Sequence, residues 1–480
     1  MGDEHGGLPL PTSDVSNGEW CPRPPTQRQA LAARLLGEEA DRRARRLGMT
    51  RTQFLRTAAG TLTAFWVLNR VHGLPSRGDA AVLPLDDVHC QDLGAADDYL
   101  RDQYFIVDVQ THHVDIAAFP GAASALCFLR FLETNLSCAE RYQHLSQTNF
   151  VKEVFVDSET DVAVISGVPG GTILPVETMA ATRNLANGLA GSERTLIQAM
   201  IDPAAPAGYQ TALDTLDRQV EANGARAIKC YTGTSAPGGE WRMDDENIAY
   251  PMLEKASQMG IKLINVHKGL PGLGGNDPMY VATDDLPKAI HDFPNLKFCA
   301  YHSGYFPTDA GYGQGIDGFI QMAESLPLHD RRRLYAEIGS TFAMTFLQSP
   351  EAAAHLVGRL LKTLRPSHVL WGTDSIWWGS PQWQIDAFKS LQIPAAMQEQ
   401  FGYPALTTRV KKRILGLNAA RLYGLNPRAV RCAIRADQLS KVQAEQGGVR
   451  VARSLQTYGP RTRREFLTLL RQEARRTPFA

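Results

Sequence analysis

Apolar and polar positions along the chain repeat one order, a short strand-like run followed by a longer helical segment. Each run of β-branched or apolar residues leads into a loop of Gly, Pro or polar residues. The runs are FIVDV (105–109), DVAVIS (161–166), TLIQAMID (195–202), ARAIKCY (225–231), KLINVH (262–267), KFCAYH (297–302), LYAEIGS (334–340) and HVLWGTD (368–374). Because the runs are almost continuously apolar, they are typical of parallel strands buried on both faces.

The segments between the runs have helical spacing, most clearly over 174–191, 246–259, 313–326 and 350–363. Such segments supply the crossovers that connect parallel strands. Eight strand–helix units over roughly 270 residues match the usual size of a (β/α)₈ barrel. An open doubly wound sheet is the alternative, but it usually carries a glycine-rich phosphate loop after its first strand, where this chain has histidines. We therefore predict an α/β fold, a (β/α)₈ TIM barrel.

The sequence suggests that the chain has four parts. Residues 1–28 are rich in Gly, Pro, Ser and charge and are expected to be disordered. Residues 29–96 form a helical extension, and the barrel occupies 97–426. Residues 427–480 form a basic helical tail, with twelve Lys and Arg against four Asp and Glu. A solvated helix face is the favoured interpretation of this charge, and a patch for an acidic partner or a subunit contact is the alternative.

Composition limits the partners. The formal net charge is zero, so nothing global indicates a nucleic-acid or membrane-surface partner. No apolar run reaches the roughly 18 residues that a membrane span requires. The seven cysteines show no CxxC spacing and do not indicate a disulfide framework. The expected partner is a small-molecule substrate, and a homo-oligomer is left open.

One segment of the sequence is relevant to whether the protein stays in the cytoplasm or is exported. Residues 50–69 begin TRTQFLR and continue into a mildly apolar stretch, which resembles a degenerate twin-arginine export signal. Thr52 stands where such a signal has its second arginine, and no small-x-small cleavage site follows. The alternative is a helix that docks on the barrel. A cytoplasmic location is favoured, with periplasmic export as the other possibility.

Candidate chemistry lies at the ends of the predicted strands. The first strand leads into His112, the fourth carries Lys229, and the fifth, sixth and eighth end at His267, His302 and Asp374. The carboxyl ends of barrel strands surround one mouth, so these side chains should converge. Imidazoles and a carboxylate suit a borderline divalent metal such as zinc, which could activate water near neutral pH.

Each of these residues also has an ordinary structural explanation. A single histidine at a strand end more often serves as a hydrogen-bonded structural residue, but three in one barrel favour a site. His113 should point away from His112, because side chains alternate along a strand. Lys229 is interpreted as a cation that faces the substrate, with a carbamylated metal ligand as the alternative. Glu337 either contacts the ligand or caps the next helix.

The motifs together resemble the amidohydrolase-related family, the branch of the amidohydrolase superfamily that includes aminocarboxymuconate-semialdehyde decarboxylase. The resemblance covers about residues 100–426 and rests on seven motifs in order. They are DVQTHH (108–113), AIKCYTG (227–233), NVHKG (265–269), AYHSGY (300–305), YAEIGS (335–340), WGTDS (371–375) and ILGLNAARLYGL (414–425).

The resemblance implies site roles. The family's first strand reads Asp-x-His-x-His with both histidines as metal ligands; its second histidine maps onto His112, but its first falls on Gln110. A glutamine carbonyl is a weaker ligand than imidazole for such a metal. By the same resemblance His267 is a ligand, His302 is a ligand or orients water, and Asp374 is a ligand that also handles the proton of the water.

The expected function is therefore a metal-dependent hydrolase, with zinc as the first candidate metal. It would act on a small, cyclic or aromatic substrate, with Asp374, His302 and Lys229 as catalytic residues. Lys268 is a second candidate for stabilising developing negative charge. A metal-dependent non-oxidative decarboxylase is the alternative. A binding barrel that has lost catalysis is a third possibility, and its only support is Gln110.

Overall fold

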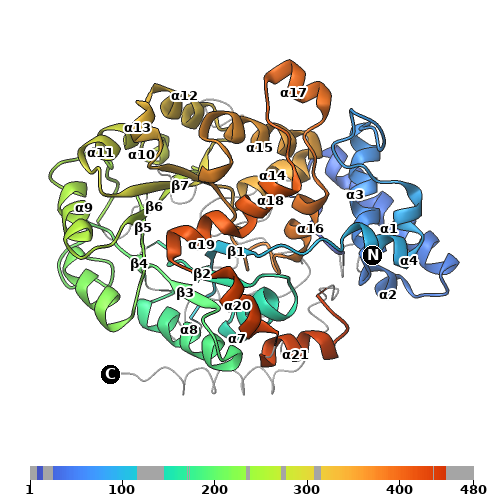
Figure 1. Ribbon diagram of the computed structural model, residues 1–480, viewed down its shortest axis with the longest axis horizontal. Helices are drawn as coiled ribbons and strands as arrows, with labels where there is room; N and C mark the ends of the chain where they lie inside the picture. Colours follow the sequence, from blue (N-terminus) through green and yellow to red (C-terminus); the bar gives the residue numbers. More distant parts are fainter. Residues whose placement is uncertain are drawn as a thin grey trace.

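The protein is described here by a computed structural model. It describes residues 8–13, 25–115, 145–169, 171, 173–233, 238–271, 277–307, 315–435 and 437–449. Its parallel strands form a ring surrounded by helices (Figure 1). The strands are β1 (Val107–Thr111), β2 (Val162–Ile165), β3 (Thr195–Ile197), β4 (Ala199–Met200), β5 (Ile228–Tyr231), β6 (Leu263–Gly269), β7 (Lys297–Tyr305), β8 (Leu334–Glu337) and β9 (Val369–Leu370).

The ring closes through two junctions. β3 and β4 are separated only by Gln198, and they pair with β2 and β5 respectively, so together they act as one strand of the barrel. At the other junction the Val109 N–H donates to the Trp371 carbonyl at 3.0 Å, and Thr111 pairs in parallel with Ser375. The predicted (β/α)₈ barrel is therefore confirmed, and each of the eight predicted runs supplies one of its strands.

Helices cover the outside of the ring, as the crossover pattern predicts (Figure 1). The four clearest helical segments in the sequence correspond to α8, α9, α12 and α15. The helices that follow the strands are α7 (Gln147–Val151), α8 (Val176–Ala190), α9 (Ala249–Gln258), α10 (Pro278–Val281), α11 (Leu286–Asp292), α12 (Asp317–Ser325), α13 (Leu328–Arg331), α14 (Thr341–Gln348), α15 (Pro350–Leu364), α16 (Gln382–Ser390), α17 (Ala395–Phe401) and α18 (Thr408–Lys412), with short 3₁₀ or π turns between some of them.

The N-terminal extension packs on one side of the barrel (Figure 1). It consists of α1 (Gln27–Arg46), α2 (Arg51–Leu55), α3 (Ala58–His72) and α4 (Leu93–Tyr99). Phe65 of α3 is fully buried and meets Phe346 of α14 edge to face, with ring centroids 5.4 Å apart. The segment that resembles an export signal thus forms α2 and α3, which dock on the barrel. None of the helices in the described part of the chain is both long and apolar enough to cross a membrane.

This contact predicts a stability effect. Phe65→Leu should lower the free energy of unfolding by about 1 kcal/mol, because an edge-to-face aromatic pair contributes about 0.5–1.5 kcal/mol beyond its buried area. Urea unfolding would measure the change. The exposed Leu189→Ala serves as the control and should change stability by less than about 0.5 kcal/mol. Equal stability of Phe65→Leu and the unaltered protein would show that α3 does not depend on this contact.

The first residues differ in part from the expectation. Leu10 is buried against the main core, so the expected disorder of residues 1–28 does not hold for 8–13. α1 begins at Gln27, where Thr26 and Gln29 form a reciprocal capping box. Residues 1–7 and 14–24 lie outside the described part of the chain.

The C-terminal helices α19 (Asn418–Tyr423), α20 (Pro427–Ile434) and α21 (Gln438–Glu445) also pack on the barrel. Val430 belongs to the same apolar cluster as the barrel interior, together with Ala419, Ala420 and Tyr423. Arg194 Nη1 lies 2.9 Å from Asp437 Oδ2 in a buried ion pair. The first part of the predicted tail therefore helps to close the barrel at the amino ends of its strands, whereas 450–480 lie outside the described residues.

Candidate active site at the barrel mouth

The side chains singled out in the sequence lie at the carboxyl ends of the strands and are buried. Asp374 Oδ1 lies 3.2 Å from His112 Nε2 and 3.2 Å from Gln110 Nε2. Gln110 Nε2 is also 3.3 Å from His302 Nε2. Four of the predicted ligands, Gln110, His112, His302 and Asp374, are therefore in direct contact, although they come from three separate parts of the sequence.

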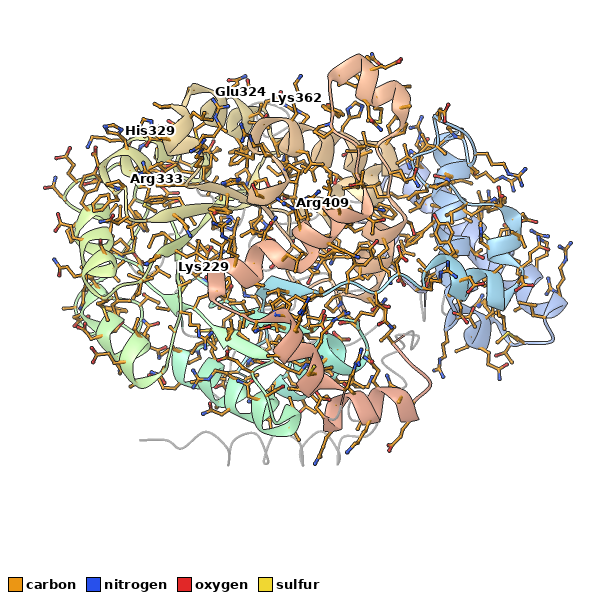
Figure 2. All side chains as sticks on the ribbon, in the orientation of Figure 1. Lys229, Glu324, His329, Arg333, Lys362 and Arg409 are labelled. Carbon is orange, nitrogen blue, oxygen red and sulfur yellow. The ribbon has the colours of Figure 1, made fainter. Side chains whose placement is uncertain are left out.

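The remaining two predicted site residues, His267 and Lys229, contact this group or its surroundings through aromatic rings. The His267 ring lies 4.8 Å from the His302 ring and stacks at 5.2 Å on Tyr231. Lys229 Nζ lies 4.6 Å from the centre of the Tyr231 ring and 3.9 Å from that of Tyr301. His267 thus borders the group directly, and the Lys229 ammonium lies against two aromatic faces within the barrel, where Figure 2 labels it.

Backbone contacts orient two of the histidines. His112 Nδ1 lies 2.8 Å from the Ser166 carbonyl oxygen, and His302 Nδ1 lies 2.7 Å from the Gly339 carbonyl oxygen. Because a carbonyl can only accept, each Nδ1 must carry a proton and donate it. In the neutral rings each Nε2 then presents a lone pair to the site, which is the tautomer that a metal-binding histidine needs.

His112 Nε2 and Gln110 Oε1 are the two buried polar atoms of this group that a cation or a proton could satisfy. A neutral His112 would place its Nε2 lone pair against Asp374 Oδ1, and two acceptors at that distance repel each other. His112 Nε2 has no hydrogen-bond partner among the described residues, and neither does the buried Gln110 Oε1. A proton or a divalent cation held among these atoms would satisfy them. By donor type, two neutral imidazoles, an amide and a carboxylate suit a divalent metal; among the described residues, no three His or Asp donors of this group have ligand atoms that all lie within 4.8 Å of one another.

The Gln110 amide is oriented with its NH₂ group towards His302 and Asp374. Its Nε2 lies between His302 and Asp374, and an amide NH₂ can donate to both. With the amide turned over, Oε1 would face a lone pair and a carboxylate, so this orientation is the favourable one without a metal. Turning the amide would instead present Oε1 as a ligand to a cation.

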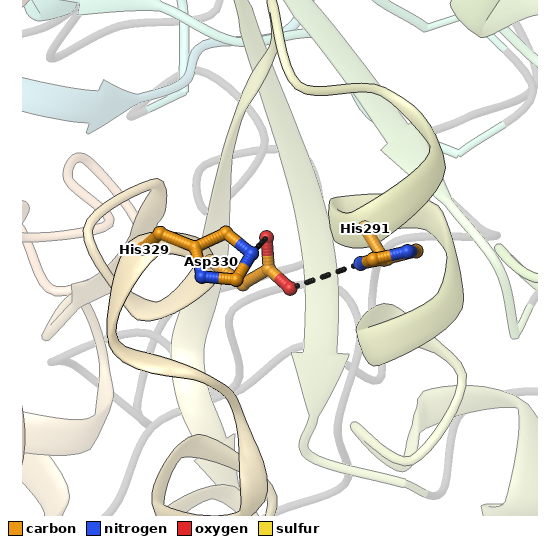
Figure 3. A group of neighbouring side chains, drawn as sticks. All are labelled: His291, His329 and Asp330. Carbon is orange, nitrogen blue, oxygen red and sulfur yellow. Dashed lines mark hydrogen bonds and ion pairs between the residues drawn. The ribbon is translucent and has the colours of Figure 1, made fainter.

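A second group of possible metal ligands lies on α11 and α13 (Figure 3). Among the described residues, His291, His329 and Asp330 are the one trio of His, Cys, Asp or Glu whose ligand atoms all lie within 4.8 Å of one another. Both histidines are exposed, and Arg333 forms an ion pair with the same Asp330 carboxylate. Because Asp330 is already paired with a cation, this surface cluster is an ordinary ion-pair network.

Several residues that support the site were not identified as site residues from the sequence. Ser340 donates to Asp374 Oδ2, and Trp378 Nε1 donates to Ser340 Oγ at 2.8 Å. Asp108 accepts from the Thr373 N–H at 3.0 Å and from the Thr373 hydroxyl, so it ties β1 to the segment that carries Asp374. Burial raises the pKa of Asp108 to about 8. An acidic residue inside an apolar strand run was the only sequence signal for this role.

The Glu337 carboxylate contacts backbone N–H groups at the mouth, and its contact with a ligand stays a prediction. It accepts the His302 N–H at 3.0 Å and also the Gly339 N–H, and it is fully buried. A Cβ atom at Gly372 would collide with Glu337 Oε1, so this glycine makes room for the carboxylate. Burial raises the pKa of Glu337 to about 7. Glu337 therefore positions the backbone of His302.

The backbone itself is constrained at the mouth. His302, Ser303, Ser340 and Asp374 all have φ between 52° and 61°, in the left-handed region that residues other than glycine rarely adopt. Such conformations persist where the surrounding structure enforces them, and they are frequent at active sites.

Two other sequence expectations can be compared with the structure. His113 points away from the group, and its Nε2 lies 2.9 Å from Thr182 Oγ1 of α8, as the alternation of the strand predicts. Lys268, expected as a candidate for stabilising charge, instead forms a buried ion pair with Asp285 at 2.6 Å. That part of the expectation is wrong, because Lys268 follows His267 in the strand and so faces outward towards α11.

One family model matches a large part of this chain. The family model described as Amidohydrolase matches residues 175–425, which is just over half of the chain. A comparison with curated protein sequences finds no match.

Three solved structures illustrate the structural comparison. An uncharacterised TIM-barrel protein of Bordetella bronchiseptica is 16% identical, with a TM-score of 0.43, over 66% of this chain and 98% of that one. The 5-carboxyvanillate decarboxylase LigW of Sphingomonas paucimobilis is 15% identical (TM-score 0.40; 68% and 100%). A protein of Pseudomonas putida described as a 2-pyrone-4,6-dicarboxylic acid hydrolase is 14% identical (TM-score 0.41; 67% and 98%). Since the family model covers most of the barrel, this chain belongs to the amidohydrolase family.

Proposed function

We propose that this protein is a metal-dependent hydrolase that acts on a small cyclic or aromatic substrate, cleaving a carbon–nitrogen, ester or carbon–carbon bond. The supporting observation is the buried Asp374 carboxylate, 3.2 Å from both His112 Nε2 and Gln110 Nε2. A carboxylate held among neutral imidazoles can accept a proton from water and pass it on, which is general acid–base chemistry.

Gln110, His112, His267, His302 and Asp374 are the residues that would hold the metal, with zinc as the first candidate. A divalent metal would supply, when bound, a Lewis acid that makes water a stronger acid near neutral pH. The other roles fall to the chain itself. Asp374 takes the proton at Oδ1 while Ser340 holds Oδ2, and it then returns the proton to the leaving group.

Other side chains orient or stabilise the reacting groups. His302 presents an Nε2 lone pair that can orient the attacking water, and Glu337 fixes its backbone. The Lys229 ammonium, which lies against Tyr231 and Tyr301, stabilises negative charge that develops above it. Trp377, whose ring centre is 5.9 Å from that of His112, supplies an apolar wall suited to a flat substrate ring.

Decarboxylation is the competing reaction for the same site. It requires a cation to hold the departing carboxylate, and an arginine fork is the usual device for that geometry. No arginine occurs in the motifs at the carboxyl ends of the eight strands. This composition favours hydrolysis.

Isotope labelling distinguishes the two reactions. Purified protein is incubated with candidate cyclic amides, lactones and aromatic acids in ¹⁸O-labelled water, with zinc or manganese added. Hydrolysis predicts label in the organic product and no CO₂. Stoichiometric CO₂ release without label in the organic product would contradict the hydrolase proposal, and no turnover of any substrate class would favour a binding barrel.

Gln110→His tests the proposed metal ligands. An imidazole is a better ligand than a neutral amide for a borderline metal, so this variant should bind zinc at least about tenfold more tightly. Competition with a chromogenic chelator would measure the affinity. His113→Gln is the matched control, because His113 lies against α8, and it should leave zinc affinity unchanged. Equal affinity of Gln110→His and the unaltered protein would show that Gln110 does not contribute to binding the metal.

A further inference from the structure

A pocket lies at the opposite end of the barrel from the mouth. Its lining includes Lys297 at the start of β7, Tyr335 in β8 and His368 just before β9, so it opens where these strands begin. Its volume is about 760 Å³, within the range of pockets that hold small molecules. The amino ends of barrel strands are not where the catalytic chemistry of this fold lies.

The pocket is strongly cationic. Seven of its sixteen lining residues are Lys or Arg, and none is Asp or Glu. Besides Lys297, these cations come from three further places along the chain. They are Arg331 and Arg332 at the end of α13, Lys362 and Arg365 at the end of α15, and Arg413 and Arg421 in the segment that leads into and through α19.

The described part of the chain supplies no carboxylate as an ion-pair partner for these cations. Within the described ranges, none of the seven forms an ion pair with Asp or Glu. Lys362 Nζ donates to the Phe401 carbonyl at 2.9 Å, and Arg331 donates to the Leu326 carbonyl at 3.1 Å. Glu324, which is not among the lining residues, accepts from the lining residue Thr363 at 3.4 Å; Figure 2 labels Glu324 and Lys362. The pocket therefore holds a concentrated positive charge.

Burial and the positive charges of the pocket lower the pKa values of two of its own lining residues, Lys297 and His368. Burial, and then the positive charges of Arg421 and Lys262, lower the pKa of Lys297. Burial, and then Arg365 and Arg421, lower the pKa of His368. Like charges that repel one another in a concave site make it attractive to an anion, because an anion relieves the repulsion.

The lining also has an apolar component. Leu328 and Leu417 are among the large hydrophobic side chains that remain exposed, at 54% and 42%. Leu364, Leu422 and Tyr335 complete this wall. Guanidinium groups match phosphate oxygens with paired hydrogen bonds, and the apolar wall suits an attached organic group. We propose that this pocket binds a small molecule that carries several phosphate groups.

Clustered phosphates could come from a free polyphosphate or from a nucleotide. Two probes distinguish these sources in isothermal titration calorimetry of the full chain, inorganic triphosphate and a nucleoside triphosphate. Both should bind. Tighter binding of the nucleoside triphosphate would indicate that the apolar wall contributes, and equal binding would indicate that the phosphates alone are recognised.

The pocket variant is Arg413→Gln with Arg421→Gln. It should weaken binding of either probe at least about tenfold, because hydrogen bonds to charged groups are among the stronger ones in proteins. The matched control is Arg409→Gln with Arg428→Gln, two exposed arginines outside the lining, and it should bind within about twofold of the unaltered protein. If the pocket variant fails to fold, the exposed Lys362→Gln takes its place.

Three outcomes would overturn the proposal. The first is that neither probe binds the unaltered protein at millimolar concentration. The second is that the pocket and control variants lose affinity equally. The third is that a short DNA duplex displaces both probes and binds more tightly than either, with the same dependence on Arg413 and Arg421, because the pocket would then recognise a nucleic-acid backbone.

Discussion

Asp374→Asn is expected to reduce turnover by about 10²- to 10⁴-fold, the usual contribution of a positioned acid–base group. The substitution keeps the shape of the side chain but removes its charge and its basicity. Asp374 Oδ1 is 3.2 Å from both His112 Nε2 and Gln110 Nε2, so an amide there can still fill the space but cannot take a proton from water. The measurement is kcat on whichever substrate the labelling experiment identifies.

Ser340→Ala provides the graded comparison. It removes one hydrogen bond to Asp374 Oδ2 and leaves the carboxylate in place. A single hydrogen bond to a charged group contributes about 1.5–3 kcal/mol, so the loss in turnover should be about 10- to 150-fold. Metal content of each variant is measured alongside, to separate loss of proton transfer from loss of metal. If Asp374→Asn retained its metal and lost less activity than Ser340→Ala, Asp374 would not be the base.

The second large effect concerns Lys268 and Asp285, which the structure assigns to stability. Asp285→Asn should lower the free energy of unfolding by about 3–5 kcal/mol, because it leaves a buried ammonium without its counter-charge. Lys268 Nζ is 2.6 Å from Asp285 Oδ2, and both side chains are fully buried. Urea unfolding followed by circular dichroism would measure the change.

Two further variants make this test specific. Lys268→Met combined with Asp285→Asn removes both charges and should be more stable than Asp285→Asn alone. Glu246→Gln breaks the exposed pair with Lys288 and should cost less than about 1 kcal/mol, since surface ion pairs contribute little. A double variant no more stable than Asp285→Asn would show that the loss does not come from the unpaired charge.

The barrel could be predicted from the sequence because its signals are local. A strand buried on both faces must be apolar almost throughout, and that requirement appears in eight runs regardless of what packs around them. The parallel arrangement then places His112, His302 and Asp374 at one mouth. The opposite orientations of His112 and His113 follow from the same alternation.

The partners of those side chains could not be predicted, because they depend on which segments become neighbours in space. Glu337 positions His302 only because β8 lies beside β7 and because Gly372 leaves room for the carboxylate. Lys229 and Lys268 look alike in the sequence, yet one lies against two tyrosines inside the barrel and the other pairs with Asp285 outside it. Lys297 and Arg421 likewise line one pocket although more than a hundred residues separate them in the chain.

The sequence by itself thus determined the barrel, its strand order and the residue types at its mouth. Only the tertiary structure decided what each of those residues contacts, including the Gln110 amide between His302 and Asp374. The physical reason is that backbone periodicity is encoded by near neighbours in the chain. Hydrogen-bond and charge partners are set instead by long-range packing. A difference of about one ångström there decides whether two groups form a hydrogen bond.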